Sequence, residues 1–176
     1  MKRLILLRHA SADNNKFSEE NDHDKPLDKR GEADSKNLSE WLKNSFLNFD
    51  LIISSNAKRA IQTSELVFTP LGKIFQKNPA FYLCNYEEII LTLKKLDENI
   101  HNVVIVGHEP SMSETMRALV GTTRPDLEKK LNSSYYPCTM SFIYFNISNW
   151  KSLKEKYGIL EGYINPEIIN MQNEKY

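Results

Sequence analysis

The chain has 176 residues and a mass of 20.5 kDa, and its 23 Lys and Arg residues balance 23 Asp and Glu residues. This length favours a single domain over residues 1–176, since domains usually hold about 100–200 residues. Charged residues make up 26% of the chain and hydrophobic residues 40%, the ordinary balance of a soluble globular protein rather than of a disordered or membrane chain. The zero net charge, without a basic stripe, argues against a nucleic-acid partner.

The N-terminus and the cysteines predict a cytoplasmic protein. The apolar run at residues 4–7 stops after four residues at Arg8, which is too short for a secretory leader or a membrane span. Cys84 and Cys138 lie far apart and form no CxxC pair, which fits a reducing compartment without a structural zinc. We therefore expect neither export nor a membrane partner.

Short apolar runs alternate with amphipathic segments along the first half of the chain. A buried strand is predicted over residues 3–7, followed by a long polar loop over 11–25 and a helix over 29–44 that Asp28 caps. Long loops in compact domains are usually functional. The next predicted elements are a strand over 50–55, a helix over 56–68 that Pro70 and Gly72 end, a weaker strand over 80–83 and a helix over 86–96.

The second half continues the alternation and ends in a less regular tail. A β-branched strand is predicted over 102–106, a helix over 111–120, and a strand over 139–146 that could lie at a sheet edge. In the tail, residues 151–176, the pattern predicts a helical turn over 151–157, a last strand over 159–163 and a short helix over 166–172. This alternation predicts a single three-layer α/β/α sandwich with a mostly parallel central sheet.

Chemically reactive side chains follow three of the predicted strands. Arg8 and His9 follow the first strand, Arg59 comes soon after the strand at 50–55, and His108 follows the strand at 102–106. In an open parallel sheet, ligands bind outside the carboxyl ends of the strands, so these loops should share one crevice. Arginine offers a planar fork of donors that stays charged, which suits phosphate or carboxylate oxygens. The expected ligand is an oxyanion.

The two histidines allow several kinds of chemistry. A histidine in such a site can be a nucleophile, a general base or a metal ligand. His9 and His108 lack the HExxH spacing and a cysteine set, and the neighbouring arginines would repel a divalent cation, so no metal is expected. The sequence contains no GxSxG elbow, no GxGxxG loop and no Walker A loop. Phosphoryl transfer through a histidine remains, with no cofactor.

These residues stand in a set of motifs that resemble a known family. Residues 7–10 (LRHA) resemble the RHG or RHA signature of the histidine phosphatase superfamily, which also contains the phosphoglycerate mutases. Residues 22–27 (DHDKPL) with Arg30-Gly31 resemble the DHDRPL…RG segment of the SixA-like phosphohistidine phosphatases, residues 54–63 (SSNAKRAIQT) resemble SSxxxRAxQT, and residues 106–110 (VGHEP) resemble VGHxP. The resemblance implies a phosphoglycerate mutase-like fold and a metal-independent phosphatase.

The resemblance also implies a role for each motif residue. His9 would be the nucleophile that forms a covalent phosphohistidine, which water later hydrolyses. Arg8, Arg59 and a protonated His108 would bind the phosphoryl oxygens, and the bound phosphate would raise the pKa of His108. Lys25 stands where SixA-like proteins tend to carry arginine, and it would add a point charge to the phosphate site.

The chain departs from the superfamily at the proton donor. Many phosphomonoesterases and mutases of the superfamily carry an acidic residue in a PEL-like segment, and the comparable place here holds Tyr82. Glu87 and Glu88 are predicted in the first turn of the following helix, where acidic residues favour the dipole. A phosphoramidate tolerates a missing acid better than an ester, because imidazole is far less basic than an alkoxide. His23 and the aspartates beside it either shape the rim of the site or form local turns.

Three functions follow, in order of preference. The first is removal of phosphate from a phosphorylated protein at phosphohistidine. The second is a phosphomonoesterase that acts on small phosphate esters, with Glu87, Glu88 or Asp13 as the proton donor. The third is a non-catalytic phosphate-recognition module, which the intact His9 disfavours.

Overall fold

The computed structural model of the protein describes residues 1–13 and 19–173, so residues 14–18 of the predicted polar loop lie outside the described residues. The strands are β1 (Lys2–Arg8), β2 (Leu51–Ser55), β3 (Gln76–Asn78), β4 (Asn102–Gly107), β5 (Val120–Thr123), β6 (Met140–Phe145) and β7 (Gly158–Ile164). The helices are α1 (Lys29–Lys43), α2 (Lys58–Phe68), α3 (Tyr86–Lys94), α4 (Ser111–Leu119), α5 (Glu128–Leu131) and α6 (Pro166–Asn173).

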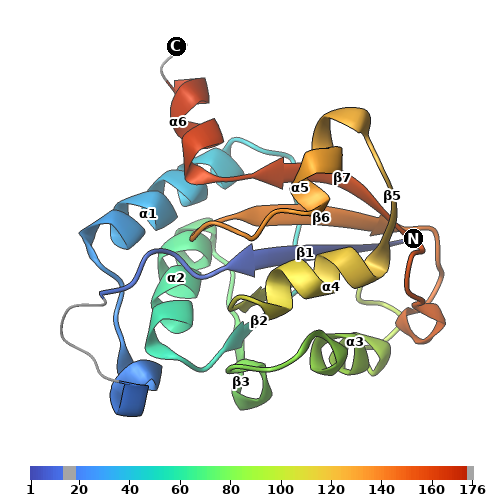
Figure 1. The fold of residues 1–176 in the computed structure, drawn as a ribbon, viewed down its shortest axis with the longest axis horizontal. Coiled ribbons are helices and arrows are strands. Elements are labelled where there is room, and N and C mark those ends of the chain that lie inside the picture. The colour runs from blue at the N-terminus through green and yellow to red at the C-terminus, as the bar shows by residue number, and fades with distance from the viewer. Residues whose placement is uncertain (14–18, 174–176) are drawn as a thin grey trace.

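The strands form one sheet with β1 and β4 near its centre (Figure 1). Within the described residues the sheet has seven strands in the order β3-β2-β4-β1-β6-β7-β5. Four of the neighbouring pairs are parallel, and only β6 runs antiparallel to its neighbours β1 and β7. The prediction of a mostly parallel sheet is confirmed. An edge position for the strand at 139–146 is wrong, because β7 pairs with the outer side of β6.

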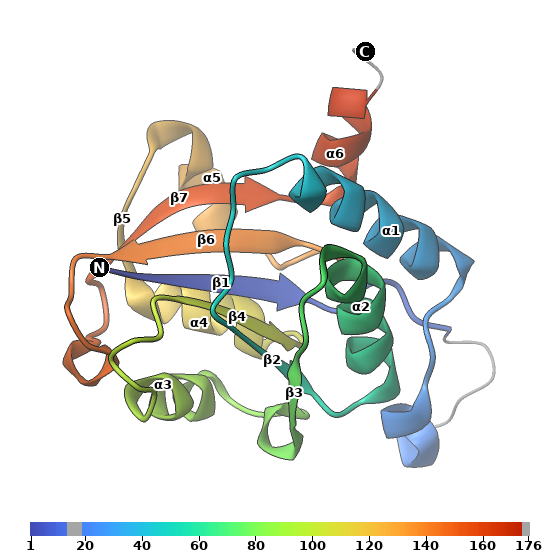
Figure 2. The ribbon, with the colours of Figure 1, turned by 180° about the vertical axis from the view of Figure 1, so that it is seen from behind.

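Helices cover both faces of the sheet, as the three-layer prediction requires. Figures 1 and 2 show α1, α2 and α6 on one face and α3, α4 and α5 on the other. The side chains of β1 alternate between the two layers: Leu4 and Leu6 pack in the cluster under α3 and α4, whereas Ile5 and Leu7 pack in the cluster under α1 and α2. A continuous apolar run therefore marks a strand that is buried on both faces.

Side-chain caps mark the starts of α1 and α3. Asp28 caps α1 by accepting a hydrogen bond from the Gly31 amide at 2.7 Å, as predicted. The predicted strand at 80–83 is wrong: residues 79–81 form a 3₁₀ turn, which Asn78 caps by accepting from the Ala80 amide, and the strand β3 precedes it. The helical turn expected over 151–157 is limited to 150–152, and the short strand β5 was not predicted.

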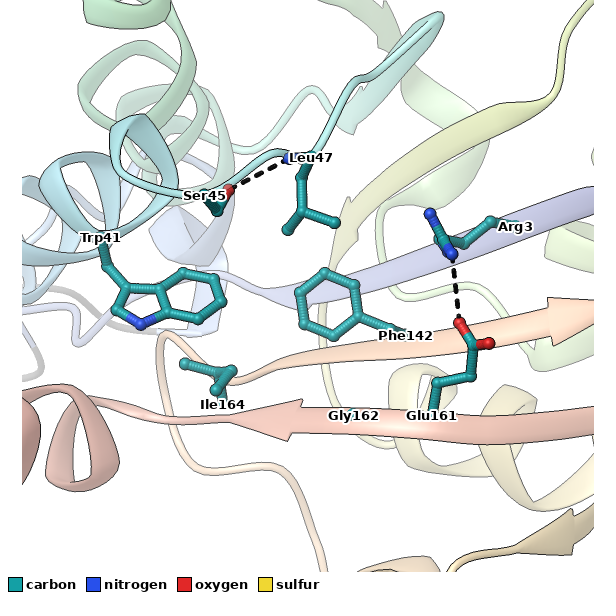
Figure 3. Close-up of a pocket in the computed structure, with 8 residues that line it drawn as sticks. All are labelled: Arg3, Trp41, Ser45, Leu47, Phe142, Glu161, Gly162 and Ile164. Carbon is teal, nitrogen blue, oxygen red and sulfur yellow. Dashed lines mark hydrogen bonds and ion pairs between the residues drawn. The ribbon is translucent and has the colours of Figure 1, made fainter.

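An apolar pocket of about 270 Å³ lies on the α1 face of the sheet (Figure 3). Trp41 and Phe142 line it, and an ion pair of 3.3 Å between Arg3 and Glu161 lies at one side. Arg3 lies near the start of β1, and Ile164 pairs through Met140 with Leu7 near its end, so this pocket extends along β1 on that face of the sheet. No described helix is long and apolar enough to cross a membrane.

Candidate active site

The three strand ends predicted to share a crevice meet at one cavity. Arg8 pairs in register with Gly107 across β1 and β4, so His9 and His108 leave neighbouring strands at the same level, with ring centroids 5.0 Å apart. Arg59 stands in the first turn of α2, directly after β2. The cavity has a volume of about 270 Å³. Its walls include the predicted site residues Arg8, His9, Lys25, Arg59 and His108, and also Ser11, Asp22, Leu83, Glu109 and Pro137.

The hydrogen bonds of His9 define its tautomer. Its Nδ1 lies 2.7 Å from the Ala10 carbonyl oxygen, which can only accept, so Nδ1 carries the proton. Its Nε2 accepts from the Nε of Arg59 at 3.3 Å, which places a lone pair on Nε2. Burial, the neighbouring His108 and the two arginines lower the pKa of His9 well below its ordinary value, so the ring is neutral at neutral pH. A neutral imidazole is the form that can act as a nucleophile.

His108 is held by a hydroxyl from β2. Its Nε2 lies 2.8 Å from the Oγ of Ser55, and among the described residues its buried Nδ1 has no hydrogen-bond partner. Burial first and Arg59 second lower the pKa of His108 to about 3. A rise in that pKa through bound phosphate stays a prediction. The same Ser55 hydroxyl accepts a hydrogen bond from the Ala57 amide at 3.3 Å, so it joins the start of α2 to His108.

Arg8 is held by the segment that precedes β6. Its guanidinium donates to the Tyr135 carbonyl, and the Cys138 amide donates to the His9 carbonyl at 3.1 Å. Burial lowers the pKa of Arg8 while Glu109 opposes that shift, and arginine stays protonated. The Nε of Arg8 is buried with no partner within the described part of the chain, so one donor of a charged group is available to an anion.

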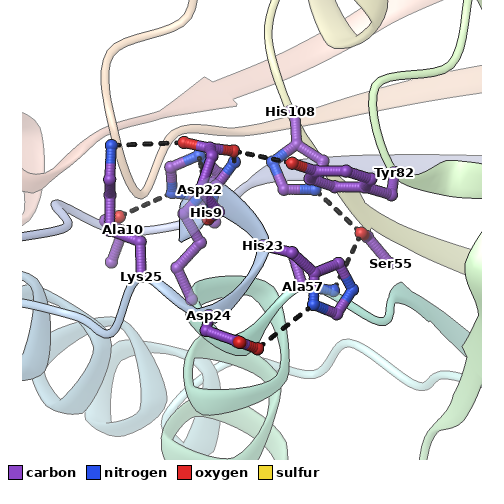
Figure 4. Close-up of polar contacts among 11 residues, drawn as sticks. His9, Ala10, Asp22, His23, Asp24, Lys25, Ser55, Ala57, Tyr82 and His108 are labelled. Carbon is purple, nitrogen blue, oxygen red and sulfur yellow. Dashed lines mark hydrogen bonds and ion pairs between the residues drawn. The ribbon is translucent and has the colours of Figure 1, made fainter. Parts of the chain in front are cut away.

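Asp22, one of the two aspartates beside His23 that were expected to shape the rim or form local turns, contacts three side chains of the site (Figure 4). One carboxylate oxygen accepts from Arg59 Nη2 at 2.8 Å and from the Tyr82 hydroxyl at 2.9 Å, and the other lies 3.2 Å from Lys25 Nζ. Burial would raise the pKa of Asp22, but the hydrogen bonds from Arg59, Tyr82 and Lys25 hold it at about 2. His23 lies edge-on to Tyr82 at 4.9 Å, so this part of the loop is a wall of the site rather than a local turn alone.

Tyr82 lies at the place where the acidic residue of many relatives was expected. Its ring is edge-on to His108 at 5.7 Å, and its hydroxyl donates to Asp22. Burial and the Asp22 carboxylate raise the pKa of Tyr82, so the phenol keeps its proton at neutral pH. Of the predicted alternative donors, Glu87 and Glu88 lie in the first turn of α3 as expected, and neither lines the cavity.

Backbone contacts anchor the segment after His9 on α1. The Ser11 hydroxyl donates to Asp28 at 2.6 Å, and the Asp28 amide donates to the Ser11 carbonyl at 3.1 Å. A Cβ on Gly31 would lie 2.0 Å from that carbonyl oxygen, so only glycine fits there. This contact is the structural reason for the glycine of the Arg-Gly pair that follows the polar loop in the sequence.

The first turns of α2 tie the flanking segments to the site. Thr63 accepts from the Ala10 amide at 3.0 Å and donates to the Arg59 carbonyl at 2.7 Å, while Gln62 accepts from the Leu27 amide at 2.8 Å. Both residues belong to the RAxQT part of the motif, so its spacing was the signal for these contacts. Across residues 1–13 and 19–173, no group of three His, Cys, Asp or Glu side chains could hold a metal ion.

A second cavity of about 690 Å³ adjoins the first. The two cavities share the wall residues Ser11 and Pro137. Side chains of α1 and α6 line the rest of the second cavity, so the helix of the C-terminal tail stands beside the site. Two large apolar side chains on its wall are exposed, Tyr136 by 68% and Met171 by 54%.

Comparisons with known proteins agree with this geometry. Residues 4–89 match the family model of the histidine phosphatase superfamily (branch 1). This part of the chain, which holds Arg8, His9 and Arg59, is similar to that superfamily. A chloroplastic Arabidopsis thaliana protein that is uncharacterized is 30% identical to this chain over 115 residues, which are 65% of this chain and 52% of the relative. The match thus spans about half the length of that relative.

Solved structures confirm the fold expected for this superfamily. The protein histidine phosphatase SixA complexed with tungstate gives a TM-score of 0.75 at 19% identity, over 93% of this chain and 97% of that one. The alpha-ribazole phosphatase of Shigella flexneri gives a TM-score of 0.68 at 20% identity, over 93% of this chain and 96% of that one. At these identities the likeness concerns the fold alone.

Proposed function

We propose that this protein is a metal-independent histidine phosphatase that removes phosphate from protein phosphohistidine through a covalent intermediate on His9. The observation that carries the proposal is the state of the His9 ring. Its proton is on Nδ1, bound to the Ala10 carbonyl, and its Nε2 lone pair lies in a cavity lined by Arg8, Arg59 and His108.

The reaction has two steps: transfer of the phosphoryl group to His9 and its hydrolysis from His9. In the first, Nε2 attacks phosphorus and the bond between phosphorus and the leaving nitrogen breaks, while Arg8 and Arg59 bind the phosphoryl oxygens. In the second, water attacks the phosphorus of the phosphorylated His9, the Nε2–P bond breaks and orthophosphate leaves. Phosphohistidine and water thus yield histidine and orthophosphate, and the neutral His9 ring is restored.

The carboxylates of the cavity favour a leaving group that needs no strong acid. Asp22 has a pKa of about 2 and is ionised, and Glu109 accepts from the amide and hydroxyl of Ser113 with both oxygens. An alkoxide would need a proton as the ester bond breaks. A phosphohistidine ring that is protonated on its other nitrogen leaves as neutral imidazole, so the phosphoramidate suits this site better than an ester.

The larger cavity supports a protein as the substrate. A phosphoryl group bound at His9 would have its carrier near Ser11 and Pro137, the wall that both cavities share. The neighbouring Tyr136 is exposed although the chain around it is pinned, at Tyr135 by Arg8 and at Cys138 by His9. A rigidly placed, exposed aromatic side chain costs little entropy when it is buried against a partner.

The proposal is tested by comparing the wild-type protein with His9→Ala on two substrates, a protein phosphorylated on histidine and a small phosphate ester. We expect the wild type to release orthophosphate from the phosphoprotein and to form an acid-labile, alkali-stable phosphoenzyme, and the variant to do neither. Equal turnover by His9→Ala would refute the mechanism. Turnover of the ester alone would favour the phosphomonoesterase, and phosphate binding without turnover would favour the recognition module.

The protein-substrate part has its own test in Tyr136→Ala. We expect this variant to raise KM for the phosphoprotein severalfold and to leave kcat/KM for phosphoramidate unchanged. Tyr157→Ala is the matched control, because Tyr157 is exposed by 61% and lines neither cavity. Unchanged KM for the phosphoprotein in Tyr136→Ala would exclude this cavity as the docking surface.

A further inference from the structure

We propose that Asp22 is an internal competitor of the phosphoryl group: its carboxylate binds donors that a phosphoryl group on His9 requires, and substrate binding displaces it from Arg59. The inference rests on the proposed function only in taking the cavity beside His9 as the phosphoryl site. It assigns to Asp22 a role in setting affinity for every phosphorylated substrate.

Both carboxylate oxygens of Asp22 already have donors within the site. Its two oxygens contact three donors, the guanidinium of Arg59, the hydroxyl of Tyr82 and the ammonium of Lys25. The Asp22 side chain is 27% exposed, and that of Arg59 only 7%. An anion is thus already bound by the positive side chains on this wall, and charge-assisted hydrogen bonds of this kind are the strong ones.

The donors of Arg59 point to both His9 and Asp22. Nη2 and Nη1 donate to the carboxylate and the backbone carbonyl of Asp22, and Nε donates to Nε2 of His9. A phosphorus atom that bonds to Nε2 takes the position of the Nε–H donor. Because the guanidinium is planar and rigid, Nε cannot leave His9 without changing the fork that holds Asp22.

The negative charges of a phosphoryl group and of Asp22 oppose each other at this wall. A phosphoryl group within reach of Arg59 and Lys25 brings negative charge close to the Asp22 carboxylate, which is ionised at neutral pH. Two anions that share one guanidinium repel each other, so the weaker ligand gives way. The Tyr82 hydroxyl donates its hydrogen bond to Asp22. When Asp22 is displaced, this hydroxyl can donate to the substrate instead.

The test measures binding of orthophosphate by calorimetry to the wild type, Asp22→Asn and Asp24→Asn. Asp24 is the matched control, because it lies two residues along the same 3₁₀ turn, is 77% exposed and pairs with His23. We expect Asp22→Asn to bind orthophosphate about tenfold more tightly, since the lost charge removes a charge-assisted competitor, and Asp24→Asn to match the wild type.

Three results would overturn the inference. Orthophosphate affinity that is equal or weaker in Asp22→Asn would make Asp22 a positioning residue for Arg59. The absence of orthophosphate binding to both proteins would exclude Asp22 as a competitor. A crystal structure of the wild type with orthophosphate is the second measurement and does not depend on a variant. Bound phosphate beside an intact 2.8 Å contact between Asp22 and Arg59 contradicts displacement. Phosphatase activity of the wild type, measured in parallel, tests the proposed function separately.

Discussion

The sheet side of the catalytic cavity differs from its loop side in what holds the functional groups. On the sheet side, Arg8 and His9 donate to backbone carbonyls, and His108 pairs with one hydroxyl of a neighbouring strand. None of these partners carries a charge. The positions of the nucleophile and of its two neighbours are therefore set by the register of β1, β4 and β2.

On the loop side the functional groups share one charged partner. Arg59, Lys25 and Tyr82 all contact the Asp22 carboxylate, which comes from the 3₁₀ turn over 19–24. Such contacts can be exchanged for those of another anion without any change in the sheet. The difference teaches that, under the proposed function, the part of the site that would form the covalent bond is built on the sheet, and the part that would adapt to the substrate is built on the loop.

The largest effect is expected from Arg59→Ala, because the Arg59 guanidinium donates both to His9 on the sheet side and to Asp22 on the loop side. We expect kcat/KM for phosphoramidate to fall by about 10²–10³-fold, the usual cost of one lost donor to a transition-state oxyanion. Arg59→Lys should recover part of this loss, since it restores the charge but not the fork. Steady-state kinetics of both variants checks this, and a loss below about fivefold would remove Arg59 from phosphoryl binding.

A dependence of stability on pH is expected from the sheet side. The unfolded His108 binds a proton near its ordinary pKa of 6.5, whereas the folded ring does so only near 3, so stability is present above that range and is lost as the pH falls through it. The slope is at most about 1.4 kcal/mol per pH unit for this one histidine. Urea unfolding at neutral and mildly acidic pH measures it, and His108→Gln should flatten the slope. Stability that rises on acidification would contradict the burial of a neutral ring.

A smaller effect is expected from Ser55→Ala, which removes the uncharged partner of His108. A single hydrogen bond contributes about 0.5–1.5 kcal/mol, so we expect turnover to fall by about tenfold or less. Ser54→Ala is the control, because Ser54 donates to the Ser55 carbonyl and does not contact the histidine. Equal losses in the two variants would indicate general damage to the strand rather than loss of His108 orientation.

The smallest effect is expected from Lys25→Ala on the loop side. Lys25 pairs with Asp22 at 3.2 Å and its side chain is 15% exposed, but its ammonium offers no bidentate fork. We expect orthophosphate affinity to change by less than about fivefold, the range of a partly exposed ion pair. Calorimetry with orthophosphate measures this. A fall in orthophosphate affinity of about 10²-fold or more would mean that Lys25 contributes to phosphate binding as much as an arginine donor does.

The sheet side could be predicted from the sequence, and so could Arg59, Lys25 and Tyr82 as residues of the loop side, but the contacts of Asp22 that join them could not. Arg8, His9 and His108 come directly after apolar runs that can only be buried strands, so parallel pairing brings them together. Asp22 comes from a polar segment without periodicity, and nothing local says which way its carboxylate points. Its contacts with Arg59 and Tyr82 join residues 37 and 60 positions away.

The fold shows the same division. The longer elements were predicted with the right type: the strands β1, β2, β4, β6 and β7 and the helices α1, α2, α3, α4 and α6. The errors fall on short elements whose state depends on distant neighbours. Residues 80–83 have apolar and aromatic side chains that favour a strand, but Pro79 and the Asn78 cap impose a 3₁₀ turn, and β5 exists through its pairing with β7.

The pairing of Arg8 with Gly107 determines how far apart the backbones of His9 and His108 lie. Neighbouring strands lie about 4.8 Å apart wherever a sheet forms, and the rings that extend from this pair stand 5.0 Å apart. The ladder between β1 and β4 thus fixes the spacing of the backbone positions from which the two rings extend. The Ala10 carbonyl and the Ser55 hydroxyl then hold the rings of His9 and His108, so a change at either contact can alter the ring separation while the backbone spacing stays the same.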